Sequence, residues 1–319
     1  MTEIVSQAKP ESVEFPVHVR LGIYFDLDEA AYHEDEALGS SSMNALAVSP
    51  PDYWFESAMN PMRETDKATP SQIIGSATHK RVLEGRQLFE ARYAPTDFPG
   101  NIKAGIEERK RIAESNQIAI KREDWNRIQM VGAVIQANPG LSSAFTGSCG
   151  HEVSIFWEAN GLRKKARIDA LKLKASVDLK THTKTKDIPF PRSCRHAIAN
   201  YSYVVQAEHY REGRLSMAAH VKAGRVYGDH DEALLRRVAA IEDFSWVWIF
   251  VQSTGAPLTY GLTLTQGNGL YDIARNIILK AEEHYQTFMK EFGRDIPWML
   301  MEHISELHIE EMPAWWGRD

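Results

Sequence analysis

The stretch from His151 to Thr181 places the strongest constraint on what this chain can fold into. It contains three short runs in which polar and apolar residues alternate, which is the pattern of half-buried β-strands. Asn160-Gly161, a strong signal for a two-residue hairpin turn, separates the first two runs. The predicted pieces are a strand at 151–157, a returning strand at 162–173, a turn at 175–176 and a strand at 177–181. We therefore predict an antiparallel meander.

Acidic residues stand on each of these strands. Asp169 has an apolar residue on either side, and Glu152 on the first strand is a further candidate for the same site. Because side chains on a strand alternate between faces, Asp178 and Lys180 project together while Leu179 projects into a core. An Asp-x-Lys triplet also occurs by chance on solvated strand edges, but charged residues are rarely buried unless they are paired or bind a metal. Two carboxylates suit a hard cation such as Mg²⁺, and the lysine would position or polarise an attacking water.

Charge is unevenly distributed along the chain. The net charge of −6 argues against a histone-like protein that coats nucleic acid. Residues 163–186 nevertheless hold nine Lys or Arg and two Asp, whereas residues 295–319 hold six acids and one Arg. The basic stretch is either an ordinary solvated strand edge or a phosphate-binding surface. On the second interpretation Lys164, Lys165 and Arg167 would contact DNA.

His79 is a candidate metal ligand on a predicted helix that begins at Pro70-Ser71 and runs to about Glu84. It shares a helix face with Gly75, because residues four apart lie on the same side. The alternative is a hydrogen-bonded core histidine.

Gln206 and Tyr210 share one face of a long helix predicted from Pro189 to Gly213. Their ordinary role would be helix packing, and a polar role requires that this face covers the strands. The other predicted elements are a serine-capped helix starting within 39–46 and ending at 49–51, a helical region at 101–138 broken by Pro139-Gly140, strands at 245–251 and 258–264, and a helix at 267–292.

Cys149 and Cys194 are the two cysteines of the chain. Two thiols cannot supply the four ligands of an iron–sulfur cluster, and nothing indicates a disulfide framework. No apolar run reaches the roughly 18 residues that a membrane span needs. Residues 1–15 lack the basic start and apolar stretch of a signal peptide. We therefore expect a cytoplasmic protein with a disordered tail at 1–19 and no membrane partner.

Several short motifs follow one another in a characteristic order. They are Ser40-Ser41-Ser42 through Ser49-Pro50, Gly75-x-Ala77-x-His79, Glu152 to Trp157, Arg167-Ile168-Asp169, Asp178-Leu179-Lys180-Thr181, Gln206-Ala207-x-x-Tyr210-Arg211, Pro297-Trp298 and Met312-Pro313-Ala314-Trp315. Each motif is weak alone, but the ordered set, which spans residues 20–316, resembles the PD-(D/E)xK nucleases. More narrowly, it resembles the RecE exonuclease (exonuclease VIII) type carried by phages and prophages.

This resemblance implies a role for each candidate residue. The implied metal ligands are His79, Asp169, Asp178, the backbone carbonyl of Leu179 and, as a further candidate, Glu152. The implied catalytic residues are Asp169, Asp178, Lys180, which acts on the attacking water, and Gln206 and Tyr210, which lie near the scissile phosphate. The acid before the lysine is Asp178, where the signature also accepts Glu. The implied metal is Mg²⁺, with Mn²⁺ as a substitute, and the cysteine count excludes the iron–sulfur cluster of some relatives.

The implied fold is a single α/β domain at 20–319 with a restriction-endonuclease-like core. A central mixed sheet would be flanked by helices, with an N-terminal helical elaboration at 20–145 and the nuclease core and C-terminal helix at 146–319. The implied activity is a Mg²⁺-dependent 5′-to-3′ exonuclease that acts on double-stranded DNA ends in a bacterial host and leaves 3′ single-stranded tails for phage-type recombination.

The implied partners are a single-strand annealing protein and further copies of the chain in a ring-like trimer or tetramer. Two alternatives stay open. One is a nuclease of the same fold that acts on single strands, flaps or RNA, and the other, from a different class, is a catalytically inactive DNA-binding or assembly module.

Overall fold

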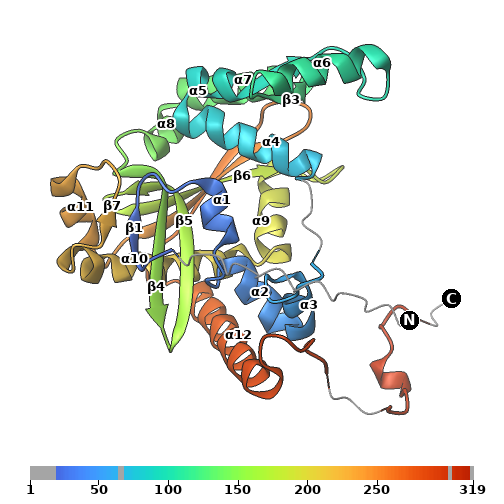
Figure 1. Cartoon of the computed structure of the whole chain (residues 1–319), viewed down its shortest axis with the longest axis vertical. Helices are drawn as coiled ribbons and strands as arrows, with labels where there is room; N and C mark the ends of the chain where they lie inside the picture. The colour runs from blue at the N-terminus through green and yellow to red at the C-terminus, as the bar shows by residue number, and fades with distance from the viewer. Residues whose placement is uncertain (1–18, 64–67, 301–303, 317–319) are drawn as a thin grey trace, which may run out of the picture.

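A mixed β-sheet forms the centre of the computed structural model, which describes residues 19–63, 68–300 and 304–316 (Figure 1). The predicted tail at 1–19 therefore lies, except for Val19, outside the described residues. The strands are β1 (Gly22–Tyr24), β4 (Gly150–Ala159), β5 (Leu162–Lys172), β6 (Ala175–His182), β7 (Val226–Tyr227), β8 (Ser245–Gln252) and β9 (Thr259–Leu264). Their order is β7-β1-β4-β5-β6-β8-β9, with β1–β7 and β6–β8 parallel and the other pairs antiparallel.

The predicted meander is confirmed as β4, β5 and β6. The hairpin turn at Asn160-Gly161 has φ angles of 54° and 72°, and both must be positive in the two-residue turn that matches strand twist. The second turn was predicted two residues too late. Ser176 is fully buried and its hydroxyl accepts a hydrogen bond from Arg214, so it belongs to the sheet, and the turn falls at 173–174.

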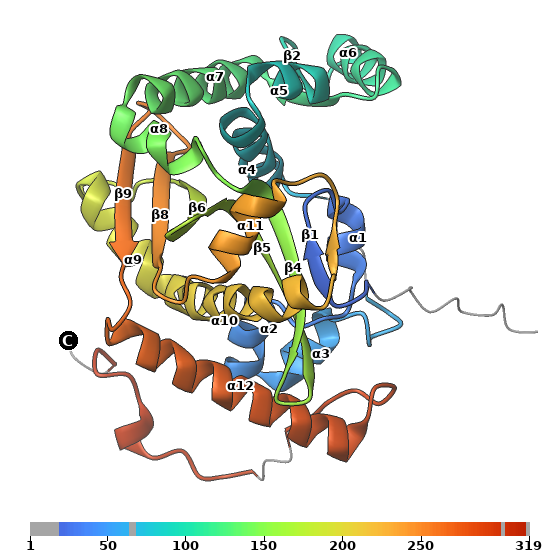
Figure 2. The same cartoon turned by 90° about the vertical axis from the view of Figure 1, so that its left-hand side faces the viewer.

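Helices cover both faces of the sheet (Figure 2). Trp246, Trp248 and Phe250 of β8 point to one face and belong to the main core, whereas Ile249 and Val251 point to the other. The helices of the first face are α9 (Phe190–Asn200), α10 (Tyr203–Lys222) and α11 (Glu232–Ala239), and those of the second are α4 (Pro70–His79), a π-helical turn η1 (Lys80–Glu84), α7 (Arg122–Ala137) and α8 (Pro139–Phe145). These layers place the strands that carry the acids between two sets of helices.

The remaining elements build outward from these layers. They are α1 (Glu29–Glu34), α2 (Ser40–Val48), α3 (Pro50–Glu56), α5 (Arg86–Arg92), β2 (Tyr93–Thr96), α6 (Lys103–Glu114), β3 (Ile118–Lys121), α12 (Leu270–Phe292) and the 3₁₀ turn η2 (Ile309–Glu311). Helix α12 packs on α2 and α10 through a second apolar cluster. No helix in the described part of the chain is both long enough and apolar enough to cross a membrane.

Three helix predictions differ from the structure. The helix predicted across 101–138 is interrupted by β3, because Ile120 packs with Phe89 and β3 pairs with β2. The α2 cap is Gly39, whose amide donates to the Ser42 hydroxyl, so the predicted serine cap is wrong. The helix predicted at 189–213 breaks between α9 and α10 at Ser202, whose φ of 50° is left-handed. The last break has consequences for the surface beside the site.

Candidate metal centre

Three side chains from three separate elements converge beside the meander. His79 at the end of α4, Glu152 on β4 and Asp169 on β5 each offer a ligand atom, and these atoms lie within 4.8 Å of one another. The Nδ1 of His79 is 3.6 Å from Asp169 Oδ2 and 3.7 Å from Glu152 Oε1. Its Nε2 is 2.8 Å from the Leu179 carbonyl oxygen. Because a carbonyl only accepts, Nε2 must carry hydrogen, and Nδ1 is the nitrogen that faces the carboxylates.

A local break in strand geometry produces this convergence. The ladder between β4 and β5 is continuous on both sides of Glu152 and Asp169 but omits that pair. Glu152 has a φ of 51°, which is uncommon for a residue with a side chain. Pairing between β5 and β6 also stops just before Asp169, whose Oδ2 instead accepts the Leu179 amide at 2.7 Å. The acids therefore gather where β6 separates from β5 and where one pair is missing from the β4–β5 ladder.

Asp178 and Lys180 project together from β6, as predicted. Asp178 is 2% exposed, and its Oδ1 accepts hydrogen bonds from Lys180 Nζ at 2.7 Å and from Gln206 Nε2 of α10 at 2.9 Å. Its Oδ2 is buried and has no hydrogen-bond partner among the described residues. Since buried polar atoms are nearly always satisfied, this oxygen is a candidate ligand atom for an ion.

Tyr210 lies one helical turn beyond Gln206 and is largely buried. Its ring packs edge-on against Trp246 at a centroid distance of 5.5 Å, as part of the main core. Burial raises the pKa of the Tyr210 phenol, with Lys180 opposing and Asp178 adding to the increase. The shared face of Gln206 and Tyr210 therefore does cover the strands, but only Gln206 makes a hydrogen bond to the acidic residues of the site within the described part of the chain.

The electrostatics of the site reflect an excess of carboxylates. Burial raises the pKa of Asp169 to about 7, against the lowering effect of His79, and the nearby charges of Asp178 and Glu152 raise it further. Burial lowers the pKa of His79, but Asp169 and Glu152 outweigh that effect and raise it to about 9. Burial likewise lowers the pKa of Lys180, but Asp178 and Asp169 raise it overall, so this side chain stays an ammonium.

The donor set fits a divalent cation. Glu152, Asp169 and Asp178 are carboxylates, which hard cations such as Mg²⁺ prefer, and a histidine nitrogen completes a set that Mn²⁺ also accepts. The unsatisfied Oδ2 of Asp178 and the close approach of Glu152 and Asp169 to His79 both favour binding of a cation here. The Leu179 carbonyl, predicted as a ligand, accepts the hydrogen bond from His79.

The prediction that Lys164 contacts DNA is wrong. Its side chain is completely buried, and its Nζ donates to Glu282 of α12 and, at 2.7 Å, to Glu212 of α10. Lys164 thus joins β5 to two helices.

Lys165 is also buried, and Arg167 is half-buried. The Nζ of Lys165 donates to the carbonyl oxygens of Tyr32 and Asp35, both at 2.6 Å. Arg167 donates to Ser154 Oγ at 2.8 Å and, at 2.7 Å, to a backbone carbonyl in the segment before α1. The ammonium of Lys165 serves the fold, so its predicted DNA contact is wrong as well, whereas the contact predicted for Arg167 stays a prediction.

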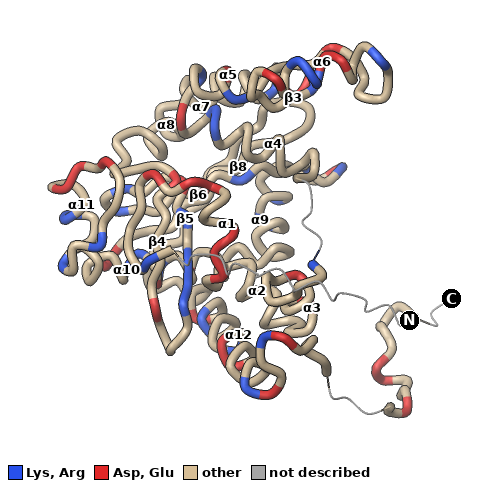
Figure 3. Tube along the Cα trace, viewed as in Figure 1, with Lys and Arg blue, Asp and Glu red and all other residues tan. Residues whose placement is uncertain are grey.

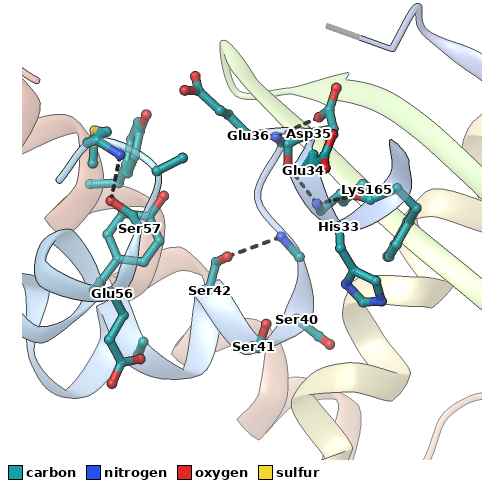
Figure 4. A pocket seen from close by; sticks show the side chains of 18 of the residues that line it. His33, Glu34, Asp35, Glu36, Ser40, Ser41, Ser42, Glu56, Ser57 and Lys165 are labelled. Atoms are coloured by element: carbon teal, nitrogen blue, oxygen red, sulfur yellow. Dashed lines mark hydrogen bonds between the residues drawn. The ribbon is translucent and has the colours of Figure 1, made fainter. Parts of the chain in front are cut away.

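A cavity of about 400 Å³ lies next to the site, between α1, α2 and α3 (Figure 4). Tyr210 and Lys165 line it, together with the run Ser40-Ser41-Ser42 and the acids Glu34 and Glu56. Its lining combines hydroxyls, acids and bases, so the cavity is polar without a single dominant charge.

The fold and the site together place this chain in the PD-(D/E)xK nuclease superfamily. The fold is the mixed sheet between helices, and the site consists of His79, Glu152, Asp169, Asp178 and Lys180. Residues 54–221, more than half of the chain, match the family described as "PDDEXK-like domain of unknown function (DUF3799)", and the chain belongs to that family. The matched segment includes every residue predicted for the metal and for catalysis. The resemblance to the superfamily and the predicted fold class are therefore confirmed.

A solved structure shares this fold. The chain is similar to a crystal structure from Eubacterium rectale described as "Putative exonuclease", with a TM-score of 0.53 and 13% sequence identity. The likeness covers 88% of this chain and 96% of that one, and at this identity it shows the fold alone. No curated protein matches the sequence.

Proposed function

We propose that this protein is a metal-dependent DNA exonuclease that hydrolyses phosphodiester bonds at the ends of linear duplexes. The observation that supports this most strongly is the cluster of His79, Glu152 and Asp169 beside an unsatisfied oxygen of Asp178. The description of the structural neighbour and the order of the sequence motifs both favour an exonuclease.

The residues of the site have separate roles in the proposed reaction. Glu152, Asp169, Asp178 and His79 would hold Mg²⁺ or Mn²⁺, which when bound neutralises phosphate charge and makes water a stronger acid. Gln206 fixes Asp178 by donating to Oδ1, which leaves Oδ2 free for the cation.

Lys180 acts as a hydrogen-bond donor in this scheme. Its ammonium uses one N–H on Asp178, and its raised pKa keeps the proton in place, so further N–H groups can donate to a phosphate oxygen or to the attacking water. A neutral lysine acting as a base would need a lowered pKa.

The finer features of the proposal rest on the RecE-type resemblance. They are 5′-to-3′ polarity, 3′ tails for phage-type recombination in a bacterial cytoplasm, a single-strand annealing partner, and a ring-like trimer or tetramer. Duplex ends are the proposed substrate.

The test compares linear and closed DNA. With Mg²⁺, the wild-type protein should degrade end-labelled linear duplex and leave covalently closed circles of the same sequence intact. Asp178→Asn keeps the Oδ1 acceptor for Lys180 and Gln206 but removes the charge, so it should abolish cleavage while DNA binding persists.

Other outcomes would replace the proposal. Cleavage of closed circles at the linear rate would make the protein an endonuclease, and preferred loss of single strands, flaps or RNA would change the substrate. Binding without cleavage in any divalent metal would favour an inactive DNA-binding or assembly module.

A further inference from the structure

An exposed aromatic residue stands at the break between α9 and α10. Tyr201 is 61% exposed, although a tyrosine normally gains free energy by burying its ring. The next residue, Ser202, holds the left-handed φ of 50° that ends one helix and starts the next. Backbone strain of this kind persists only where the surrounding structure imposes it, and it concentrates at functional sites.

Tyr201 is linked to the metal centre through Tyr203 and Lys180. Its ring stacks on Tyr203 with a centroid distance of 5.6 Å and an interplanar angle of 29°. The ammonium of Lys180 lies 4.8 Å from the centroid of the Tyr203 ring, and the same ammonium bonds to Asp178. A continuous series of contacts therefore leads from the carboxylates to the exposed ring.

Basic residues lie on α9, which ends next to this ring, and in the segment that precedes the helix. Lys184 and Lys186, in the segment after β6, are exposed, as are Arg192 and Arg195, which lie three residues apart on one side of α9. Within the described residues no ion pair involves Lys184, Lys186 or Arg192. In Figure 3, the blue of Lys and Arg is seen on α9 and on the segment after β6.

The geometry of α9 suits a stretch of nucleic acid backbone. Its 11 residues span about 16 Å, more than the distance between neighbouring phosphates of one strand. The hydroxyl of Ser193 in its first turn accepts the amide of Thr185 at 3.1 Å and lies 2.8 Å from His182 Nε2, so the basic segment is fastened to the helix. The basic groups, the ring and Lys180 are thus held on one connected support.

We propose that this surface binds the DNA strand beside the metal centre, with Tyr201 stacking on an unpaired base and Lys184, Lys186 and Arg192 contacting phosphates. The inference rests on the proposed function and extends it to a preference for opened ends. A base within a duplex is already stacked on both sides, so an exposed ring gains only where a base has left its pair.

The test uses the Asp178→Asn protein, so that DNA stays intact, and short duplexes that differ only in having a blunt or an unpaired end. A 2-aminopurine at the unpaired position reports stacking by fluorescence quenching. Tyr201→Ala should weaken binding of the unpaired end by roughly 5- to 150-fold and abolish the quenching, with little effect on the blunt duplex. Tyr201→Phe, which keeps the ring, should behave as the parent, and Tyr201→Leu as the alanine variant.

Matched controls separate this surface from general effects. Phe98→Ala removes another exposed aromatic, 48% exposed and near α6, and should change neither quantity. The log of the binding constant falls linearly with the log of the salt concentration, and each phosphate contact contributes about 0.7 to 0.9 to the steepness of that slope. Replacing Lys184 and Lys186 together by Ala should therefore make the slope shallower by about 1.4 to 1.8. Replacing the exposed pair Lys103 and Lys110 on α6 in the same way should leave it unchanged.

The outcomes distinguish this inference from the proposed function. If wild-type protein degrades linear DNA but Tyr201→Ala binds every end as its parent does, the stacking surface is wrong and the nuclease proposal stands. If Tyr201→Phe loses as much as Tyr201→Ala, the ring is not the contact and the inference also falls. If unpaired ends bind through Tyr201 but no metal supports cleavage, the nuclease proposal fails while this surface remains.

Discussion

Lys164 offers the sharpest test of how the basic stretch is used. Its ammonium lies between Glu282 and Glu212 in the interior, and Glu282 also accepts the side-chain amide of Asn160 at 2.7 Å. Lys164→Met keeps the length of the side chain and removes its charge. The variant therefore leaves Glu282, which is 4% exposed, with an amide as its remaining partner within the described residues.

The expected cost follows from that burial. Breaking a buried pair by removing one charge typically destabilises by about 3–5 kcal/mol, because the other charge remains in a medium of low dielectric constant. Glu212 adds little, since about a third of its side chain is exposed and can regain water. Unfolding entropy of about 2.1 cal/mol/K per residue over 319 residues gives roughly 0.7 kcal/mol/K, so Tm should fall by about 4–7 °C.

Thermal melting and DNA binding together decide the role of Lys164. Adding Glu282→Gln to Lys164→Met removes the stranded charge and should restore much of the lost Tm. Well below Tm, the folded Lys164→Met protein should bind DNA with wild-type affinity. An unchanged Tm combined with weaker DNA binding would refute the structural role and return Lys164 to the DNA surface.

Two further predictions concern buried titratable groups. Burial lowers the pKa of His209 to about 3, so between pH 6.5 and 3 the unfolded state binds a proton that the folded state does not, and stability falls as pH falls. From pH 7 to 5 this amounts to about 2 kcal/mol in urea unfolding, and His209→Gln should remove it; an unchanged pH slope would refute it. In EDTA, Asp169→Ala should cost about 1–3 kcal/mol because it strands the buried Leu179 amide, whereas Asp178→Asn should cost less, because the asparagine keeps the Oδ1 acceptor and removes the repulsion with Asp169. Equal losses in the two variants would contradict this division.

The sequence predicted the parts of the site that depend on local periodicity. The alternation of Asp178, Leu179 and Lys180 placed two polar side chains on one face, and the structure joins them at 2.7 Å. The turn at Asn160-Gly161 set the register of the first hairpin, since its two positive φ angles suit those residues. Both predictions needed only neighbours in sequence.

The failures share a different cause, which is that the deciding partner is distant in sequence. The acids that neutralise Lys164 come from positions 48 and 118 residues away, so a local charge count made the stretch seem like a surface. Likewise, Ile120 lies in the strand β3, inside a region of helical pattern, because β3 forms backbone pairs with β2. The break at Ser202 had no signal in periodicity, because both flanking segments are helical.

Strand geometry explains why the acids of this site can be buried together. Alternation along β5 fails at Asp169, since Ile168 and Leu171, three residues apart, both pack into the main core. The polar side chain that emerges at this irregular point takes over a backbone hydrogen bond that the separating strands can no longer make. One oxygen of Asp169 thus stabilises the separation of β5 from β6, whereas Oδ2 of Asp178 has no hydrogen-bond partner among the described residues. The carboxylates therefore lie where β5 and β6 separate, and Asp169 stabilises that separation. A cation bound there would also stabilise the separated strands.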